Sequence, residues 1–100
     1  PPAAHMLLIL VTSEKEEDAD LCAKDLAETI EKEASHVVCL GPSDAAVAKV
    51  NDIYKKVIYC KHRDYEQLIG VKDRIMARIQ QEQSFAKVMV WFDFDPMSQA

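Results

Sequence analysis

Glycine is scarce in this chain of 100 residues, which contains only Gly41 and Gly70. Phosphate-binding loops such as G-x-x-x-x-G-K-[ST] need several glycines close together, so no loop of this kind can be built here. Cysteine is nearly as scarce, because Cys22, Cys39 and Cys60 are widely spaced and form no C-x-x-C pair. An odd number of scattered cysteines argues against a disulfide framework and a zinc knuckle, and is typical of the reducing cytoplasm.

Long apolar runs are also missing. The longest extends from Met6 to Val11, far short of the roughly 20 residues that a membrane-spanning helix needs, and it lacks the flanks of a secretory signal. The chain begins with Pro-Pro rather than Met, and 49% of its residues are hydrophobic and 29% charged. We therefore expect one globular domain over residues 1–100, located in the cytoplasm, with no membrane contact and cut from a longer protein.

The sequence also lacks a recognisable set of catalytic residues. His5, His36 and His62 are not spaced for metal binding with one another or with the cysteines. Asp93 and Asp95 point to the same side of a strand and could form a carboxylate pair. The simpler interpretation is that they accept backbone N–H groups where the sheet ends. We expect no catalytic residue, no metal site and no cofactor in this chain.

The net charge of −5 conceals an asymmetry along the sequence. Nine acidic residues and three lysines lie between Glu14 and Glu33, whereas nine basic and five acidic residues lie between Lys49 and Lys87. This division is compatible with a basic surface opposite an acidic one, so the acidic mean charge does not exclude nucleic acid as a ligand.

Hydrophobic periodicity predicts two helices and four strands. Helices are expected near Ser13–Ala34 and Asp64–Gln81, because Ser13 and Asp64 each begin a capping pattern. The residues Gly41-Pro42 should end the second strand, since proline lacks the N–H that a strand ladder needs. Residues 43–50 then form a connector. Strands are expected over His5–Val11, His36–Leu40, Tyr54–Lys61 and Lys87–Phe94.

The order strand, helix, strand, strand, helix, strand predicts an α+β fold. Two crossovers of the same hand place both helices on one face of a four-stranded antiparallel sheet, which is the ferredoxin-like βαββαβ plait.

The third strand is the best candidate for a functional surface. Lysines on a strand can contact phosphates, and tyrosines offer a face on which bases stack. Alternation places Lys55, Tyr59 and Lys61 on the side away from the helices. A solvated strand with ordinary surface lysines is the alternative. The candidate DNA-binding residues are Lys49, Tyr54, Lys55, Lys56, Tyr59, Lys61 and Arg63.

Alternation also leaves apolar side chains on the side away from the helices. Met89 and Trp91 point outward from the last strand, and Thr12 favours an outward even-numbered set in the first strand. Contiguous exposed apolar area usually marks an interface, although the chain's own termini could also cover it. The candidate interface residues are Met6, Leu8, Leu10, Met89 and Trp91.

Four short features occur in the order in which a known family carries them. They are Pro-Pro before the first strand, Leu-Gly-Pro after the second, a basic and aromatic third strand, and Asp-x-Asp-Pro at residues 93–96. With this set the chain resembles the C-terminal domain family of the bacterial primosomal protein N′, a replication-restart helicase. The family's third strand alternates basic and aromatic residues. Tyr54 and Lys55 match this pattern, whereas Ile53 and Lys56 depart from it.

The resemblance implies a non-catalytic C-terminal domain of an ATP-dependent DNA helicase. Such a domain helps to bind branched or single-stranded DNA at stalled forks, meets single-strand-binding protein and contacts the rest of the helicase chain. The ATPase motor and the family's zinc cluster would lie in sequence outside this chain.

Two other functions stay open. The first is an interaction module that packs on the helicase body and touches no DNA. The second is an unrelated domain of the same fold that binds RNA or senses a small ligand. The third strand lacks the Gly-Phe-rich motif of RNA-recognition domains, which argues against the RNA-binding version.

Overall fold

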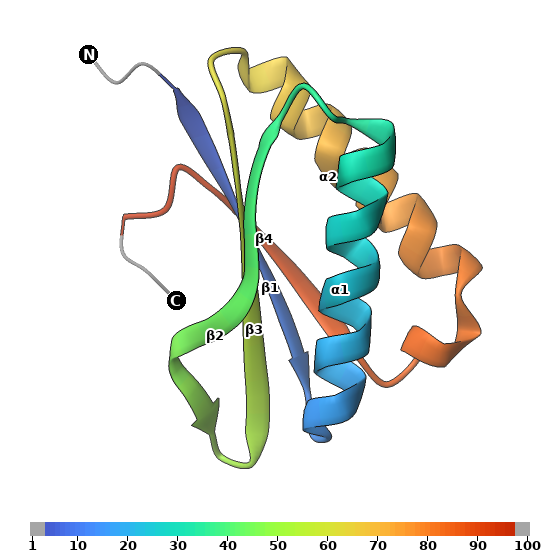
Figure 1. Ribbon diagram of the computed structural model, residues 1–100. Helices are drawn as coiled ribbons and strands as arrows, with labels where there is room; N and C mark the ends of the chain where they lie inside the picture. Colours follow the sequence, from blue (N-terminus) through green and yellow to red (C-terminus); the bar gives the residue numbers. More distant parts are fainter. Residues whose placement is uncertain (1–3, 98–100) are drawn as a thin grey trace.

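The computed structural model describes residues 4–97, so the Pro-Pro pair of the family pattern lies outside the described residues. Figure 1 shows the order strand, helix, strand, strand, helix, strand. The elements are β1 (His5–Ser13), α1 (Glu16–Glu33), β2 (Val38–Val50), β3 (Ile53–His62), α2 (Tyr65–Gln81), a short 3-10 helix (Gln83–Phe85) and β4 (Met89–Phe94).

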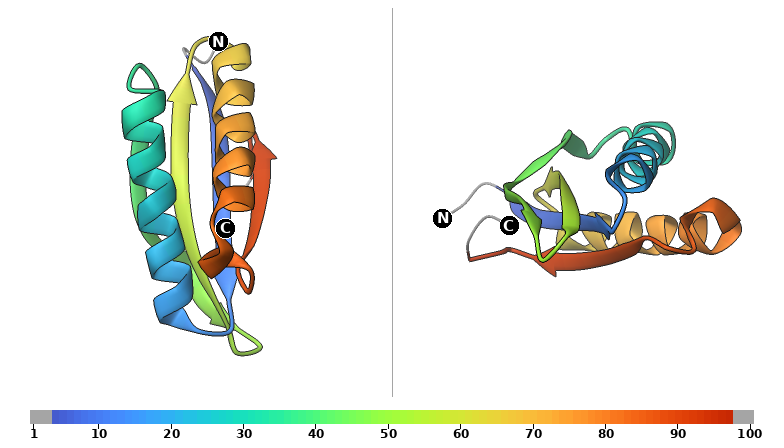
Figure 2. Two further views of the ribbon diagram at one scale, coloured as in Figure 1. Left: turned by 90° about the vertical axis from the view of Figure 1, so that its right-hand side faces the viewer. Right: turned by 90° about the horizontal axis from the view of Figure 1, so that it is seen from below.

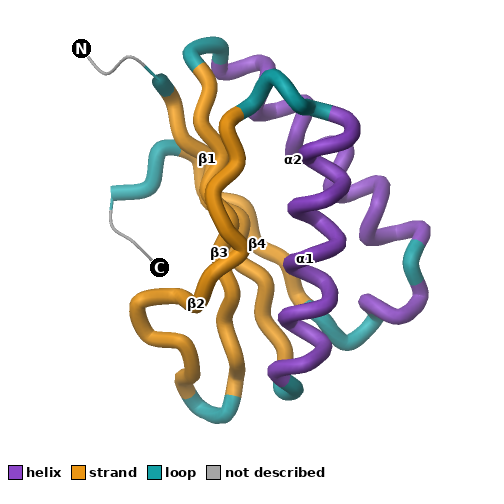
Figure 3. Tube along the Cα trace, viewed as in Figure 1, coloured by secondary structure: helices purple, strands orange, loops and turns teal. Residues whose placement is uncertain are grey.

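The strands form one four-stranded sheet in the order β2-β3-β1-β4, and each neighbouring pair is antiparallel. Both helices lie on the same side of this sheet, as the views in Figures 2 and 3 show. The predicted fold class, a ferredoxin-like α+β plait, is confirmed. We call the side of the sheet that carries no helix the open face.

The main core lies between the sheet and the helices. Leu7, Ile9 and Val11 of β1 are fully buried there against Leu26 of α1 and Ile75 of α2. Burying a leucine or isoleucine side chain contributes about 1.5–3 kcal/mol each, so this layer supplies most of the driving force for folding. The odd-numbered residues of β1 face the helices, as Thr12 in the even-numbered set indicated. No helix of residues 4–97 is both long and apolar enough to cross a membrane.

The two helices begin differently. Asp64 caps α2 as predicted, because its Oδ1 accepts a hydrogen bond from the Glu66 N–H at 3.0 Å. The predicted cap of α1 at Ser13 is wrong, since Lys15 occupies the cap position. Ser13 is instead the last residue of β1, paired with Tyr54 of β3. Its backbone therefore follows the sheet, and the helix can begin only at Glu16.

Strand β2 departs most from the prediction, because it does not end at Gly41-Pro42 and continues to Val50. Leu40 pairs with Tyr59 of β3, and Ser43 pairs with Val57. The residues between them are taken up by a register shift, which removes Pro42 from the ladder positions that need an N–H. The predicted connector over residues 43–50 is therefore strand.

The continuation of β2 covers part of the open face. Ala45 is buried against Leu8 of β1 and Val57 of β3, with Leu10 and Tyr59 packed beside them. Leu8 is only 4% exposed, so the prediction that it forms an exposed interface is wrong. Among the described residues, the hairpin of β2 and β3 covers Leu8 and forms this second, smaller core.

Asp95 connects the two ends of the described chain. Its Oδ1 accepts the Met6 N–H at 2.8 Å, and its own N–H donates to the Met6 carbonyl at 2.7 Å. Its Oδ2 lies 2.8 Å from Nδ1 of His5. The Met6 N–H and then His5 lower the pKa of the Asp95 carboxyl group. Asp95 is thus the backbone acceptor that the sequence indicated, whereas Asp93 is exposed on β4.

Candidate functional site

The open face carries part of the predicted basic surface. Lys55, Tyr59 and Lys61 alternate along β3 on this face, because Val57 between them faces Leu8 and Ala45. The two lysines are six residue steps apart along the strand, which corresponds to about 20 Å. The salt bridges of residues 4–97 use other lysines and leave Lys55 and Lys61 free.

Lys56 belongs to the other side of β3 and is buried. Its Nζ donates to Asp44 Oδ1 of β2 and, at 3.1 Å, to Glu16 Oε2 at the start of α1. The hydrogen bond to Asp44 is the main reason that the pKa of Lys56 is raised. Two carboxylates therefore neutralise this amine within the domain, and it holds β2, β3 and α1 together. Lys56 has no remaining charge to offer a phosphate.

The remaining candidates lie at the two ends of β3. Lys49 and Tyr54 are cross-strand partners at the hairpin, where the Lys49 Nζ lies 5.1 Å from the Tyr54 ring centroid and 3.4 Å from Oδ1 of Asp52. Arg63 is exposed in the loop after the opposite end of β3. The structure therefore separates the predicted DNA-binding residues into an open-face group, a hairpin pair and a loop arginine.

Apolar side chains share the open face with these lysines. Met89 and Trp91 of β4 are 58% and 53% exposed, as alternation predicts, whereas Met6 and Leu10 are half-buried. Val38 and Leu40 of β2 are also exposed there, opposite Lys61 and Tyr59. These two residues were missed by the sequence analysis, although alternation from the buried Val37 indicates an outward Val38.

The open-face part of the predicted DNA-binding surface and the predicted apolar interface thus form one surface. It consists of apolar side chains, Lys55 and Lys61, and among the described strand residues Asp93 is its one acidic member. The acidic residues of α1 lie on the opposite side of the sheet. The arrangement gives a polarised domain in which an anion meets the open face more favourably than the helix layer.

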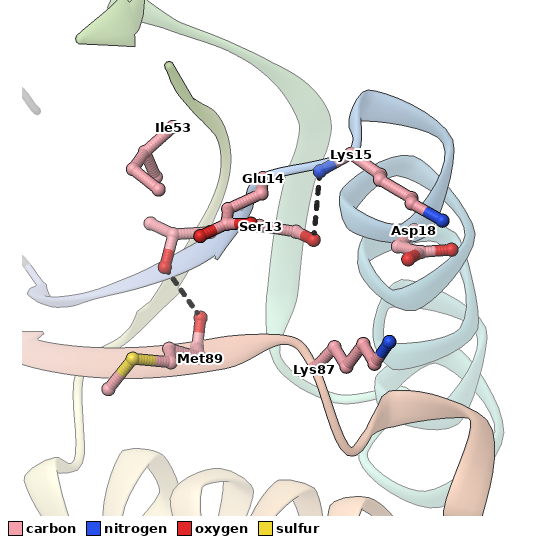
Figure 4. Close-up of a pocket in the computed structure, with 8 residues that line it drawn as sticks. Ser13, Glu14, Lys15, Asp18, Ile53, Lys87 and Met89 are labelled. Atoms are coloured by element: carbon pink, nitrogen blue, oxygen red, sulfur yellow. Dashed lines mark hydrogen bonds between the residues drawn. The ribbon is translucent and has the colours of Figure 1, made fainter. Parts of the chain in front are cut away.

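A hollow of about 380 Å³ lies where β1 leads into α1 (Figure 4). The Thr12 hydroxyl donates to the Met89 carbonyl at 3.1 Å, and Ser13 Oγ accepts from the Lys15 N–H at 3.2 Å. Two lysines and two carboxylates line it (Lys15, Lys87, Glu14 and Asp18), so its charges compensate one another. No three His, Cys, Asp or Glu side chains of residues 4–97 are arranged to hold a metal ion.

The architecture and the open face define a small ferredoxin-like α+β domain with one exposed apolar and basic face of its sheet. A family model described as the primosomal protein N C-terminal domain matches residues 1–97, and the chain belongs to this family. The resemblance seen in the short motifs is thereby confirmed. Membership supports a primosomal role in replication restart and, in general terms, interaction with DNA or replication proteins.

Solved structures agree with the fold. The de novo designed protein Foldit4 matches with a TM-score of 0.70 at 17% identity, over 95% of this chain and 99% of that one. A dimeric ferredoxin-like protein from an uncultured marine organism matches with a TM-score of 0.59 at 6% identity, over 97% and 94%.

A hydantoinase/carbamoylase family amidase from Burkholderia ambifaria has a TM-score of 0.56 at 14% identity, over 97% of this chain but 28% of the amidase. Identities this low show the fold alone. No curated protein sequence matches the chain.

Proposed function

We propose that this chain is the non-catalytic C-terminal domain of a primosomal replication-restart DNA helicase, and that its open face helps to bind branched or single-stranded DNA. The observation that carries the proposal is the pair Lys55 and Lys61, which have no carboxylate partner in residues 4–97 and flank Tyr59. Phosphates along a strand can be neutralised by such spaced lysines, while Tyr59 or Trp91 offers a surface for stacking.

Of the other predicted contacts, Arg63 is assigned to this surface, which it extends at the far end of β3. Lys49 and Tyr54 are left out, because they pair at the hairpin on the side of Lys56, where Tyr54 lines a hollow together with Glu16 and Glu17 of α1. Lys56 is also left out, because its amine already donates hydrogen bonds to Asp44 and Glu16.

The parent protein supplies the remaining activities in this proposal. Its ATPase motor and zinc cluster lie in other parts of the parent chain, and this domain binds no cofactor. Single-strand-binding protein and the helicase body are its protein partners, and the assembly works in the cytoplasm. The family assignment supports this setting.

A salt titration tests the DNA contact. The double variant Lys55→Ala/Lys61→Ala should lower the slope of log K against log salt by up to about two units, because each phosphate contact contributes about 0.7–0.9. Binding of the wild-type domain should be weak, since the chain carries a net charge of −5. The measurement is fluorescence anisotropy with labelled single-stranded and forked DNA at several salt concentrations.

A matched variant separates a local contact from a change in total charge. Lys24→Ala/Lys32→Ala removes the same charge from exposed positions of α1, on the other side of the sheet. It should leave the slope unchanged. If both double variants have the wild-type slope, the open face does not bind phosphates and the proposal is wrong.

A second candidate function is supported by the exposed apolar side chains of the open face. Met89 and Trp91, with Val38 and Leu40, present a surface that the helicase body could cover without any DNA contact.

Hydroxyl-radical footprinting of Met89 and Trp91 in the isolated domain and in the intact helicase distinguishes the two functions. Protection in the intact helicase without DNA supports the interaction module. Protection that requires DNA supports the DNA-binding surface.

A further inference from the structure

Two of the three cysteines face each other across the sheet, although 20 residues separate them in the sequence. Cys39 of β2 is the direct antiparallel partner of Cys60 of β3. Directly opposed residues of antiparallel strands have Cα atoms about 4.5 or 5.5 Å apart, and both spacings lie within the range of about 4.4–6.8 Å that a disulfide spans. Both side chains lie on the helix side, since Cys60 belongs to the main core and Cys39 packs against it.

The two thiols differ in their access to solvent. Cys60 is fully buried, whereas Cys39 is half-buried and lines a hollow of about 490 Å³ together with Ala27 and Glu31 of α1. Cys39 lines this hollow and Cys60 does not, so a small molecule that enters it reaches Cys39 and not its cross-strand partner Cys60. Cys22 has neither feature, because it is fully buried and its burial raises the pKa of its thiol to about 12.

The two neighbouring thiols differ in their chemistry. The adjacent Cys60 thiol lowers the pKa of Cys39, whereas the neighbouring Cys39 and then burial raise the pKa of Cys60. Cys39 is therefore the more readily ionised thiol and the better nucleophile near neutral pH. An accessible thiolate next to a second thiol is the arrangement found where a cysteine is oxidised reversibly.

We propose that Cys39 and Cys60 are a redox modification site, at which a small hydroperoxide converts the two thiols into a disulfide across β2 and β3. The Cys39 thiolate attacks the hydroperoxide oxygen, so an S–O bond forms, the O–O bond breaks and the other oxygen leaves as water or an alcohol. Cys60 then loses its proton and attacks the Cys39 sulfur. The S–S bond forms and the oxygen of the sulfenic acid leaves as water, so the hydroperoxide receives the two electrons that the thiols lose.

Intact mass and peptide mapping after treatment with hydrogen peroxide test this site in the wild-type domain. The expected result is the loss of two hydrogen atoms per chain, a single peptide pair joined through Cys39 and Cys60, and full reversal by a thiol reductant. The oxidised form should also have a higher melting temperature than the reduced form, because the cross-link restricts the unfolded chain.

Three single variants assign the roles. Cys60→Ala should accumulate a sulfenic acid at Cys39 that dimedone traps, whereas Cys39→Ser should form neither the adduct nor the cross-link. Cys22→Ala is the matched control and should oxidise as the wild type does, since Cys22 lacks a partner sulfur among the described residues.

The peptide map of the wild-type domain decides the matter even if a core variant does not fold. Unmodified Cys39 and Cys60 after peroxide treatment would overturn the proposal. So would a cross-link that joins two chains through Cys39, or a Cys39 sulfenic acid that persists in the wild type as it does in Cys60→Ala.

Discussion

Replacing Gly41 by Ala should destabilise the domain by about 2–6 kcal/mol, because two separate costs add. The backbone of Gly41 has φ +104°, and a Cβ there would lie 2.8 Å from the Val57 carbonyl oxygen and 3.2 Å from the Ser43 nitrogen. Holding an alanine at this φ costs about 1–3 kcal/mol. Moving the neighbouring backbone of β3 costs about as much again, since overpacked sites lose about 1–3 kcal/mol.

The same replacement at Gly70 is the matched control and should have the opposite sign. Gly70 lies inside α2, and a Cβ there would meet only the Arg74 guanidinium, at 3.0 Å. The end of that flexible side chain can move aside. Alanine is favoured over glycine in a helix interior, so Gly70→Ala should stabilise the domain by up to about 1 kcal/mol.

Urea denaturation followed by circular dichroism measures both variants against the wild type, with the free energy obtained by linear extrapolation. A Gly41→Ala domain within about 0.5 kcal/mol of the wild type, the range of a neutral surface change, would refute the close approach of β2 to β3 at this residue. Destabilisation by both variants to the same extent would show that the loss reflects the added methyl group and not the site.

Two further results follow from burial and from an ion pair. Leu8→Ala should cost about 2–5 kcal/mol in urea denaturation, whereas Trp91→Ala should change the stability by less than about 0.5 kcal/mol; equal losses would contradict the assignment of the open face. Asp25→Asn should cost about 1–2 kcal/mol at neutral pH, because Asp25 accepts hydrogen bonds from Arg78 at 2.8 and 2.7 Å across the two helices. These hydrogen bonds lower the pKa of Asp25 below 3.8, so its contribution is complete above pH 3.8 and is lost as the pH falls through the folded-state pKa. Thermal denaturation of both proteins between neutral and acid pH checks this, and a difference that persists unchanged in acid would argue against the ion pair.

The features that depend on the local hydrophobic pattern or on residues close in sequence could be predicted from the sequence. Alternation in β4 placed Trp91 outside the main core, and alternation in β1 together with Thr12 placed Ile9 inside it; both placements are confirmed. The start of α2 was also predictable, since Asp64 caps the helix by accepting a hydrogen bond from the N–H of Glu66, only two residues away. Each of these features depends on local geometry.

The features that depend on distant neighbours were not predictable. Pro42 indicates a strand end locally, yet β3 accommodates it through a register shift and β2 continues. Lys56 looks like a surface lysine until Asp44 and Glu16 are brought to it from β2 and α1. The pairing of Cys39 with Cys60 likewise requires the register of β2 on β3, which no pattern within either strand specifies.

The hydrogen bonds of Asp95 to the start of β1 place both ends of the described chain at the same edge of the domain. Leu7 pairs with Phe94, so the first residues of β1 and the last residues of β4 lie side by side at this edge in antiparallel strands. A mechanical load that pulls His5 and Asp95 apart therefore acts on one hydrogen-bonded pair at a time, and does not shear the whole ladder at once. Under such a load the domain would yield gradually from this edge while the pairing of β1 with β3 remained intact.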